Sequence, residues 1–243
     1  MNTVKDISYY AEIMNIKLSD TQKKQFDTYM SMVIEKNKVI NLTAITDPEE
    51  FALKHFADSI SILSAIEETS LLSSKEVSLI DVGTGAGFPA IPLKIVCPNF
   101  QLTLLDSLNK RVSFLRDVIT ALNLNGITAV HARAEEGGRK KELRDSFDFV
   151  VSRAVANLST LAEYCLPYAK TGGLFISYKS GNVEAELSEA KRAITLLGGE
   201  VSEVKGFRLA DSDIGRSFVV IRKINPTPKA YPRKPGTAKR DPL

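Results

Sequence analysis

A short apolar run that leads directly into a glycine-rich turn constrains this chain more than any other feature of its sequence. Residues 79–82 read LIDV, which is typical of a buried strand, and residues 83–87 read GTGAG. Residues 88–96 can then start a helix. Glycines let the backbone turn sharply and approach a ligand without a Cβ in the way. The sequence therefore predicts a ligand site at the carboxyl end of the first strand of an open α/β sheet.

The region after residue 77 alternates short β-rich runs with helical stretches. Helical stretches at residues 110–123 and 183–197 carry apolar residues at helical spacing. The expected strands are residues 77–82, 101–106, 127–130, 147–151, 173–178, 200–206 and 217–224. This α/β pattern predicts a seven-stranded, mostly parallel sheet covered on both faces. The last two strands are joined without a clear helix, which predicts a closing antiparallel hairpin.

The N-terminal region is helical in pattern. Ser19 begins a capping box with Gln22, and Asp47 followed by Pro48 marks a second helix start. We expect three parts: an N-terminal helical extension over residues 1–72, a ligand-binding domain over residues 73–224, and a tail over residues 225–243.

The tail is distinguished by its charge and its prolines. It holds five of the ten prolines and a net charge of +4, although the whole chain has only +3. Its basic residues are Lys229, Arg233, Lys234, Lys239 and Arg240. The prolines predict an extended segment with no regular helix. The charge fits either an arm that contacts phosphates, with Arg233 and Lys234 as candidates, or a solvated terminus.

Composition excludes several classes of protein. With 44% hydrophobic and 25% charged residues, the chain is expected to fold without disulfides. It contains no apolar run of 18 residues and does not begin with a signal peptide, so we expect a cytoplasmic location and no membrane contact. Cys97 and Cys165 lie too far apart for a metal-ligand pattern, and we expect no metal.

Three features narrow the class of ligand. The glycine spacing is G-x-G-x-G, and Phe88 stands where a dinucleotide fold has its last glycine, which disfavours NAD and FAD. Asp106 ends the second strand, where a carboxylate can accept hydrogen bonds from ribose hydroxyls. Ala134 and Glu135 follow the third strand, where the adenine of a ligand would lie. Taken alone, Glu135 is expected to be a solvated surface residue, and only its combination with the other features favours a ligand contact.

The chain resembles a known family, the bacterial small-subunit ribosomal RNA guanine-N7 methyltransferases, also called the glucose-inhibited division protein B family. The similar segments are residues 41–45, 55–59, 81–89, 104–107, 110–115, 151–154 and 231–237. The resemblance implies a class I methyltransferase fold with a Rossmann-like sheet and a helical extension. It also implies S-adenosylmethionine as methyl donor and N7 of one guanosine in 16S ribosomal RNA as acceptor.

The resemblance also assigns residues to the cofactor. It implies that Asp106 holds the ribose and that Gly85 and Gly87 shape the turn. The implied cofactor contacts are Gly83, Phe88, Ala134, Glu135 and Arg153. No catalytic residue is assigned, because guanine N7 already presents a lone pair and needs no general base. The protein then has to supply alignment and exclusion of water.

Several polar residues are candidates for the acceptor site. His55 and Asp58 are spaced i, i+3 and share a helix face, where they could line the acceptor pocket or pair locally, for instance Asp58 with Lys54. Lys179 follows the fifth strand and could contact phosphate or be solvated. We expect His131 to be structural. The expected partner is 16S ribosomal RNA or the small-subunit particle, and the expected state is a monomer.

Two rival functions stay open from the sequence. One keeps the cofactor but methylates a small molecule or a protein. The other is a nucleotide- or NAD-binding module without methyl transfer. Calorimetric titration separates the second from a methyltransferase, because it predicts affinity for NAD and none for S-adenosylmethionine.

The turn itself can be tested by substitution. Gly83→Val places a β-branched side chain where the backbone should approach the ligand, so we expect S-adenosylmethionine binding to be abolished while the helical extension stays folded. Calorimetric titration measures the affinity and circular dichroism the helix content. Unchanged affinity would show that the turn is not the site.

Overall fold

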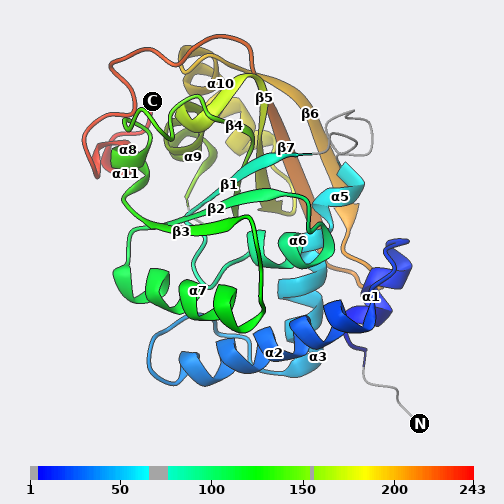
Figure 1. Ribbon diagram of the computed structural model, residues 1–243. Coiled ribbons are helices and arrows are strands. Elements are labelled where there is room, and N and C mark those ends of the chain that lie inside the picture. Colours follow the sequence, from blue (N-terminus) through cyan, green and yellow to red (C-terminus); the bar gives the residue numbers. More distant parts are fainter. Residues whose placement is uncertain (1–4, 66–75, 154–155) are drawn as a thin grey trace.

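One seven-stranded sheet organises the molecule in this computed structural model, which describes residues 5–65, 76–153 and 156–243 (Figure 1). The strand order is β3-β2-β1-β4-β5-β7-β6. The strands are β1 Ser78–Val82, β2 Gln101–Asp106, β3 Ile127–His131, β4 Phe147–Arg153, β5 Ala169–Ser180, β6 Gly199–Arg208 and β7 Gly215–Lys223. β1 to β5 are parallel, and β7 runs antiparallel to both β5 and β6. The predicted sheet and its antiparallel closure are confirmed.

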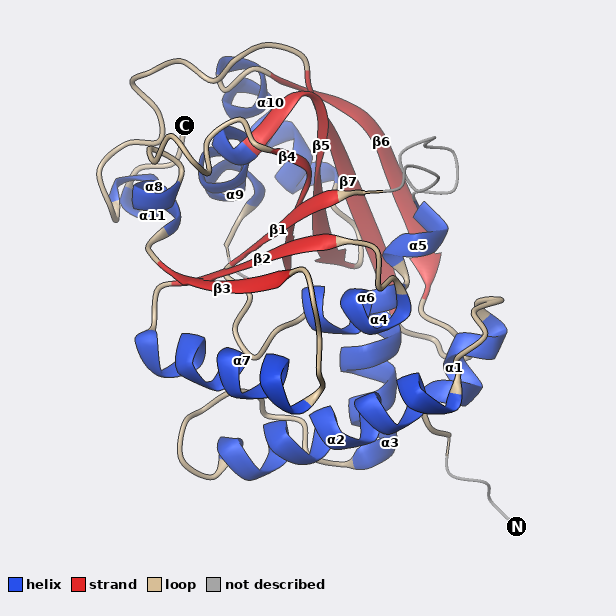
Figure 2. Ribbon diagram, viewed as in Figure 1, coloured by secondary structure: helices blue, strands red, loops and turns tan. Residues whose placement is uncertain are grey.

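Helices cover both faces of this sheet (Figure 2). On one face lie α6, α7 and the N-terminal helices, and on the other lie α8, α9, α10 and α11. The helical segments are α1 Ile7–Ile13, α2 Asp20–Asn37, α3 Pro48–Phe51, the π-helical turn Ala52–Ala57, α4 Asp58–Ile60, α5 Ile62–Ala65, α6 Ala90–Val96, α7 Asn109–Ala121, α8 Ala134–Gly137, α9 Leu158–Cys165, the 3₁₀ turn Leu166–Tyr168, α10 Glu184–Leu196 and α11 Thr237–Arg240. None of the described helices is both long and apolar enough to cross a bilayer.

The predicted helix starts are present in the structure. The side chain of Ser19 accepts a hydrogen bond from the amide of Gln22, and Gln22 Oε1 accepts one from the amide of Ser19. Asp47 caps α3 by accepting from the amide of Glu50 at 2.9 Å, with Pro48 at the first helical position. The reciprocal bonds of Ser19 and Gln22 and the single bond of Asp47 satisfy amides at the helix starts that have no partner within the helix.

The N-terminal helices share a hydrophobic core with the sheet. Phe26, Tyr29 and Phe56 are buried in the same cluster as Leu79 of β1 and Leu104 of β2. Because this core is shared, the extension packs directly on the sheet, and its side chains lie close to the glycine-rich turn. The expected boundary between residues 72 and 73 lies outside the described residues.

The tail differs from the expected extended segment, because α11 forms at Thr237–Arg240. Its prolines flank this helical turn, with Pro235 before it and Pro242 after it, so they interrupt none of its hydrogen bonds. Gly236 enters the turn with a φ of +83°, and Ala238 is fully buried. The tail thus folds back onto the protein beside α8 and α9, as Figure 1 shows.

The contact between the extension and the glycine-rich turn can be tested at Tyr29. Its hydroxyl, fully buried, donates a hydrogen bond to the carbonyl of Ala86 at 2.8 Å. Tyr29→Phe leaves that carbonyl without its partner, so we expect the free energy of unfolding to fall by about 1–3 kcal/mol, measured by urea denaturation. The matched control is Tyr9→Phe, whose hydroxyl bonds Asp211 at the surface and should cost less. If the free energy of unfolding fell equally in the two variants, the hydrogen bond from Tyr29 to Ala86 would not be the stabilising contact that we infer.

Candidate functional site

The glycine-rich turn connects β1 to α6. The amides of Gly83 and Thr84 donate to the carbonyl of Leu105 at 2.9 and 3.1 Å, which ties the turn to β2. Gly85 has a φ of +62°, and a Cβ built there would meet nothing within 4 Å, so the space beside the turn is open. Gly87 is required for packing, because its Cβ would lie 2.7 Å from the hydroxyl of Tyr29.

Two buried carboxylates support the turn. Asp81 accepts from the hydroxyl of Thr84 at 2.7 Å and from the amide of Ala90 at 3.3 Å, and complete burial raises the pKa of its carboxyl to about 7. Asp106 accepts from the amides of Gly85 at 3.0 Å and Leu108 at 2.8 Å. The carboxylate of Asp106 therefore lies at the end of β2, as the sequence predicts, and also braces the turn of the neighbouring strand.

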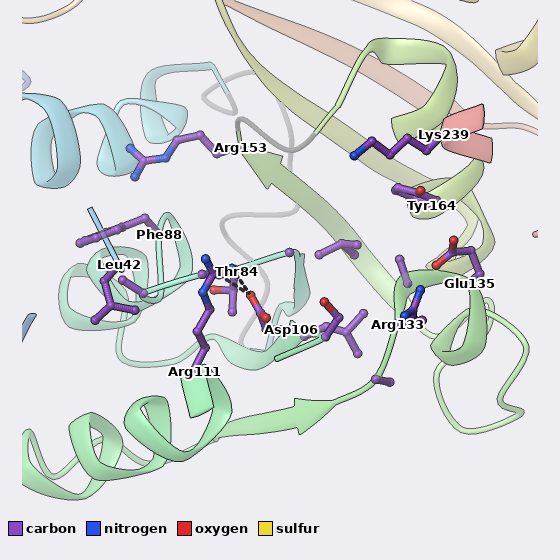
Figure 3. Close-up of a pocket in the computed structure, with 18 of the residues that line it drawn as sticks. Leu42, Thr84, Phe88, Asp106, Arg111, Arg133, Glu135, Arg153, Tyr164 and Lys239 are labelled. Carbon is purple, nitrogen blue, oxygen red and sulfur yellow. Dashed lines mark hydrogen bonds and ion pairs between the residues drawn. The ribbon is translucent and has the colours of Figure 1, made fainter. Parts of the chain in front are cut away.

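A cavity of about 630 Å³ opens at the carboxyl ends of the first strands (Figure 3). It is lined by Leu42, His55, Val82, Gly83, Thr84, Gly85, Ala86, Phe88, Leu105, Asp106, Ser107, Arg111, Ala132, Arg133, Ala134, Glu135, Arg153, Tyr164, Gly236 and Lys239. Of the residues expected at a cofactor, all but Gly87 are in this lining. Their contact with a cofactor stays a prediction.

Phe88 forms one wall of this cavity and is itself almost covered. Its ring stacks on the imidazole of His55, with centroids 4.6 Å apart and planes 5° from parallel. The guanidinium of Arg153 lies 5.2 Å from the centroid of the Phe88 ring, a cation–π contact. The wall thus combines the turn, the N-terminal extension and the end of β4.

Asp58 joins two arginines that come from different strands. Its two oxygens accept from Arg153 at 2.9 Å and from Arg216 at 2.8 Å, and its side chain is only 5% exposed. The alternative in which Asp58 pairs with Lys54 is wrong, because Lys54 bonds Glu50 at 2.6 Å. The sequence spacing allowed the local pair, but the fold brings two arginines to the carboxylate.

His55 is held as a neutral side chain. Its Nδ1 faces the Arg153 guanidinium at 3.3 Å, and its Nε2 lies 2.6 Å from the hydroxyl of Thr43. Burial, and then the positive charge of Arg153, lower the pKa of His55 to about 3. Since a guanidinium can only donate, Nδ1 accepts and Nε2 carries the proton.

A second cavity of about 480 Å³ adjoins the first. It is lined by Ile45, Lys54, His55, Asp58, Arg153, Tyr178, Lys179, Ser180, Glu186 and Arg216. His55 and Arg153 line both cavities. Lys179, whose ammonium bonds Glu186 at 2.6 Å, lies here, so the structure brings together His55, Asp58 and Lys179. What these residues bind stays a prediction.

The other candidates lie elsewhere. Arg233 is paired with Glu163 at 2.7 Å, and Lys234 is exposed; both are absent from the two linings given above. His131 contacts the carbonyl of Ser107 at 3.0 Å. Within the segments 154–155 and 66–75 the structure describes nothing, and the family-like segment 151–154 is therefore only partly described.

Sequence reasoning missed several residues of the first cavity. Arg111 could have been found, because it lies in the first turn of the helix that follows Asp106. In the structure its guanidinium is 3.6 Å from the carboxylate of Asp106. Gly236 lies in the family-like segment 231–237 and Lys239 among the basic residues of the tail, but neither was given a place at the cavity, because no local pattern brings the chain end to the sheet.

The described residues contain no cluster of side chains suited to hold a metal ion, and their two cysteines lie outside both cavities. Over residues 5–65, 76–153 and 156–243, no three His, Cys, Asp or Glu side chains are grouped to hold a metal ion. Both cysteines are free, and burial raises the pKa of both thiols, that of Cys97 to about 11. Neither cysteine lines the two cavities described above.

Comparison with known proteins gives a family and a fold. Residues 22–214 match the family described as GidB, rRNA small subunit methyltransferase G. A Lactobacillus johnsonii protein named ribosomal RNA small subunit methyltransferase G is 49% identical over 93% of this chain and 94% of its own length.

Two solved structures share the fold at 15% identity. MtNAS in complex with MTA and tNA has a TM-score of 0.55 and matches 84% of this chain and 74% of its own. M. jannaschii TYW2 in complex with AdoMet has a TM-score of 0.50, over 67% and 76% respectively.

The neutral state of His55 predicts a pH dependence of stability. The unfolded chain takes up a proton at His55 near pH 6.5, whereas the folded protein takes it up only near pH 3. Between these values the unfolded state binds more protons at His55, so this residue contributes a fall in the free energy of unfolding as the pH drops from 6.5 towards 3. Asp81, whose pKa is raised to about 7, contributes in the opposite direction whether or not His55 is present. The contribution of His55 is therefore the difference between the intact protein and His55→Gln, which cannot titrate and should lose less stability over this range in urea denaturation. Above pH 7 the two proteins should show parallel pH dependence, and identical curves at pH 4–6 would contradict the prediction.

Proposed function

Since this chain belongs to the ribosomal RNA small subunit methyltransferase G family, we propose that it transfers the methyl group of S-adenosylmethionine to N7 of a specific guanosine in 16S ribosomal RNA. The observation that carries the proposal is the pair of adjoining cavities. One lies at the glycine-rich turn and the other is separated from it by His55 and Arg153. A donor and an acceptor placed in such neighbouring cavities could meet at the residues that the cavities share.

The residues of the first cavity fit the cofactor. A volume of about 630 Å³ lies within the range of ligand sites, and the open space beside Gly85 admits a close backbone contact. Asp106 would hold the ribose hydroxyls, with Ala134 and Glu135 beside the adenine at the end of the next strand. Gly83, Phe88 and Arg153 would hold the remaining part of the cofactor.

The cofactor supplies a methyl group on a sulfonium, which the N7 lone pair can take up in line as the carbon–sulfur bond breaks and its electron pair goes to sulfur. No proton leaves, so no general base is required. The residues agree with this: both nitrogens of His55 are engaged, and both oxygens of Asp58 are bound to arginines. The contribution of these side chains is alignment and exclusion of water.

The second cavity fits an RNA acceptor by its charge. Its lining includes four cationic side chains, those of Lys54, Arg153, Lys179 and Arg216, against the two carboxylates of Asp58 and Glu186. A third carboxylate, that of Glu50, pairs with Lys54 from outside the lining, which leaves one more cation than carboxylates. An excess of positive charge attracts the phosphates that flank a target nucleotide. Asp58 and Glu186 line this same cavity, and their carboxylates would stabilise the positive charge of a purine methylated there. This supports RNA over a small neutral acceptor.

The proposal is tested by mapping modified nucleosides in 16S ribosomal RNA by mass spectrometry, with and without the gene. We expect one 7-methylguanosine to be lost on deletion and restored by the intact gene. Asp106→Ala should restore it poorly, because the ribose of the cofactor loses a charged hydrogen-bond partner worth about 1.5–3 kcal/mol. The matched control, Asp117→Ala on the exposed face of α7, should restore it fully.

Two outcomes would contradict the proposal. One is an unchanged set of modified nucleosides after deletion. The other is the absence of label in small-subunit RNA from the deletion strain, both naked and in ribosomal particles, after incubation with purified protein and labelled S-adenosylmethionine.

A further inference from the structure

The C-terminal segment is bound to the protein by its backbone before it reaches the first cavity. Arg139 donates to the carbonyls of Pro232 and Ala230 at 2.9 and 3.0 Å. Arg144 donates to those of Tyr231 and Thr227 at 3.0 and 2.7 Å. Because guanidinium groups donate through a rigid planar fork, four such bonds define the course of the segment.

Arg233 then binds the segment to α9 through a buried carboxylate. Its guanidinium contacts both oxygens of Glu163 at 2.7 to 3.0 Å, and its own amide donates to Glu163 Oε1 at 2.6 Å. The side chain of Glu163 is only 1% exposed, so Arg233 is the partner that compensates its charge. The guanidinium of Arg233 already donates its hydrogen bonds to Glu163, so contact with a phosphate would have to compete with this ion pair.

The residues that follow Arg233 reach the wall of the first cavity. We name residues 231–240 the clasp. Gly236 and Lys239 of the clasp line the cavity. Figure 3 shows Lys239 on the side of the cavity where Tyr164 and Glu135 lie. The clasp is seated by the fully buried Ala238, whose carbonyl accepts from the hydroxyl of Thr160 at 3.1 Å.

The clasp also orients a carboxylate of the cavity. The amide of Gly236 donates to Glu135 Oε1 at 2.8 Å, and Glu135 is 6% exposed. Among the described residues no hydrogen bond is recorded to Glu135 Oε2. One oxygen of Glu135 is thus occupied by the clasp, while the other remains to accept a hydrogen bond from a ligand.

We infer that the clasp is part of the cofactor site and that, through Gly236, it orients Glu135 to recognise the exocyclic amino group of adenine. The reason is the order of the strand ends. Asp106 ends β2 and suits the ribose hydroxyls. The adenine attached to that ribose would then lie at the end of the next strand, β3, and Glu135 comes shortly after this strand. Adenine presents a donor there, and a carboxylate oxygen is its natural acceptor. The inference rests on the proposed function.

The experiment compares two ligands by calorimetric titration of the full chain. One is S-adenosylhomocysteine, and the other is its analogue with purine in place of adenine, which lacks the amino group. The intact protein should bind the purine analogue at least about tenfold more weakly, because it loses a hydrogen bond to a charged group. Equal affinity of the intact protein for both ligands would overturn the inference.

Variants of the clasp provide the second readout. Glu163→Leu combined with Arg233→Met replaces the ion pair by apolar groups of similar size, which avoids leaving a buried charge. We expect this protein to bind S-adenosylhomocysteine more weakly and to prefer it over the purine analogue by less than about threefold, since Glu135 loses its orientation. The control Lys229→Ala removes one exposed tail charge before the clasp and should keep the preference of the intact protein.

A chain that ends at Pro235 tests the same point and keeps the ion pair between Arg233 and Glu163, while it removes Asp241, a second contact of Arg233. It loses the Gly236 amide and Lys239 and should also lose the preference. Circular dichroism and thermal unfolding establish that each variant is folded. A folded variant of either kind with the full tenfold preference overturns the inference. Absence of S-adenosylhomocysteine binding by the intact protein would instead overturn the proposed function.

Discussion

The packing of the Phe88 ring between the glycine-rich turn and the N-terminal helices is the contact on which the site depends. A turn made of glycines has few side chains of its own, so its shape has to be imposed from outside. Phe88 is 6% exposed and lies against the rings of Tyr29, Phe51, His55 and Phe56. The helical extension is therefore a structural part of the first cavity, in addition to the role proposed for it at the acceptor.

The second constraint is the ion pair network at Asp58. One carboxylate, 5% exposed, holds Arg153 from β4 and Arg216 from β7. Burial, and then the charge of Arg153 that faces it, lower the pKa of His55 to about 3, so the imidazole is neutral near pH 7. The side chains at the junction of the two cavities are thus all engaged, which suits a reaction that moves no proton and requires fixed geometry.

Much of the fold could be predicted from the sequence because its determinants are local. The strand runs, the capping box at Ser19 and the carboxylate at the end of β2 all follow from patterns within a few residues. The tail was misread because its composition is local evidence, whereas its structure depends on partners far away. Arg233 pairs with Glu163, 70 residues earlier, and Asp58 pairs with Arg216, 158 residues later. No periodicity in the chain signals such pairs.

These long-range contacts give two of the basic residues in the tail a role within the folded protein. Its five basic residues suggested an arm for phosphates, but the guanidinium of Arg233 neutralises a buried carboxylate, and Lys239 lies at the first cavity. Removing the tail would therefore expose Glu163 without its partner and open the wall beside Glu135. Loss of RNA methylation after such a truncation would not by itself indicate an RNA-binding arm. Cofactor affinity has to be measured in the same protein, because the structure places the tail at the cavity proposed to hold the cofactor.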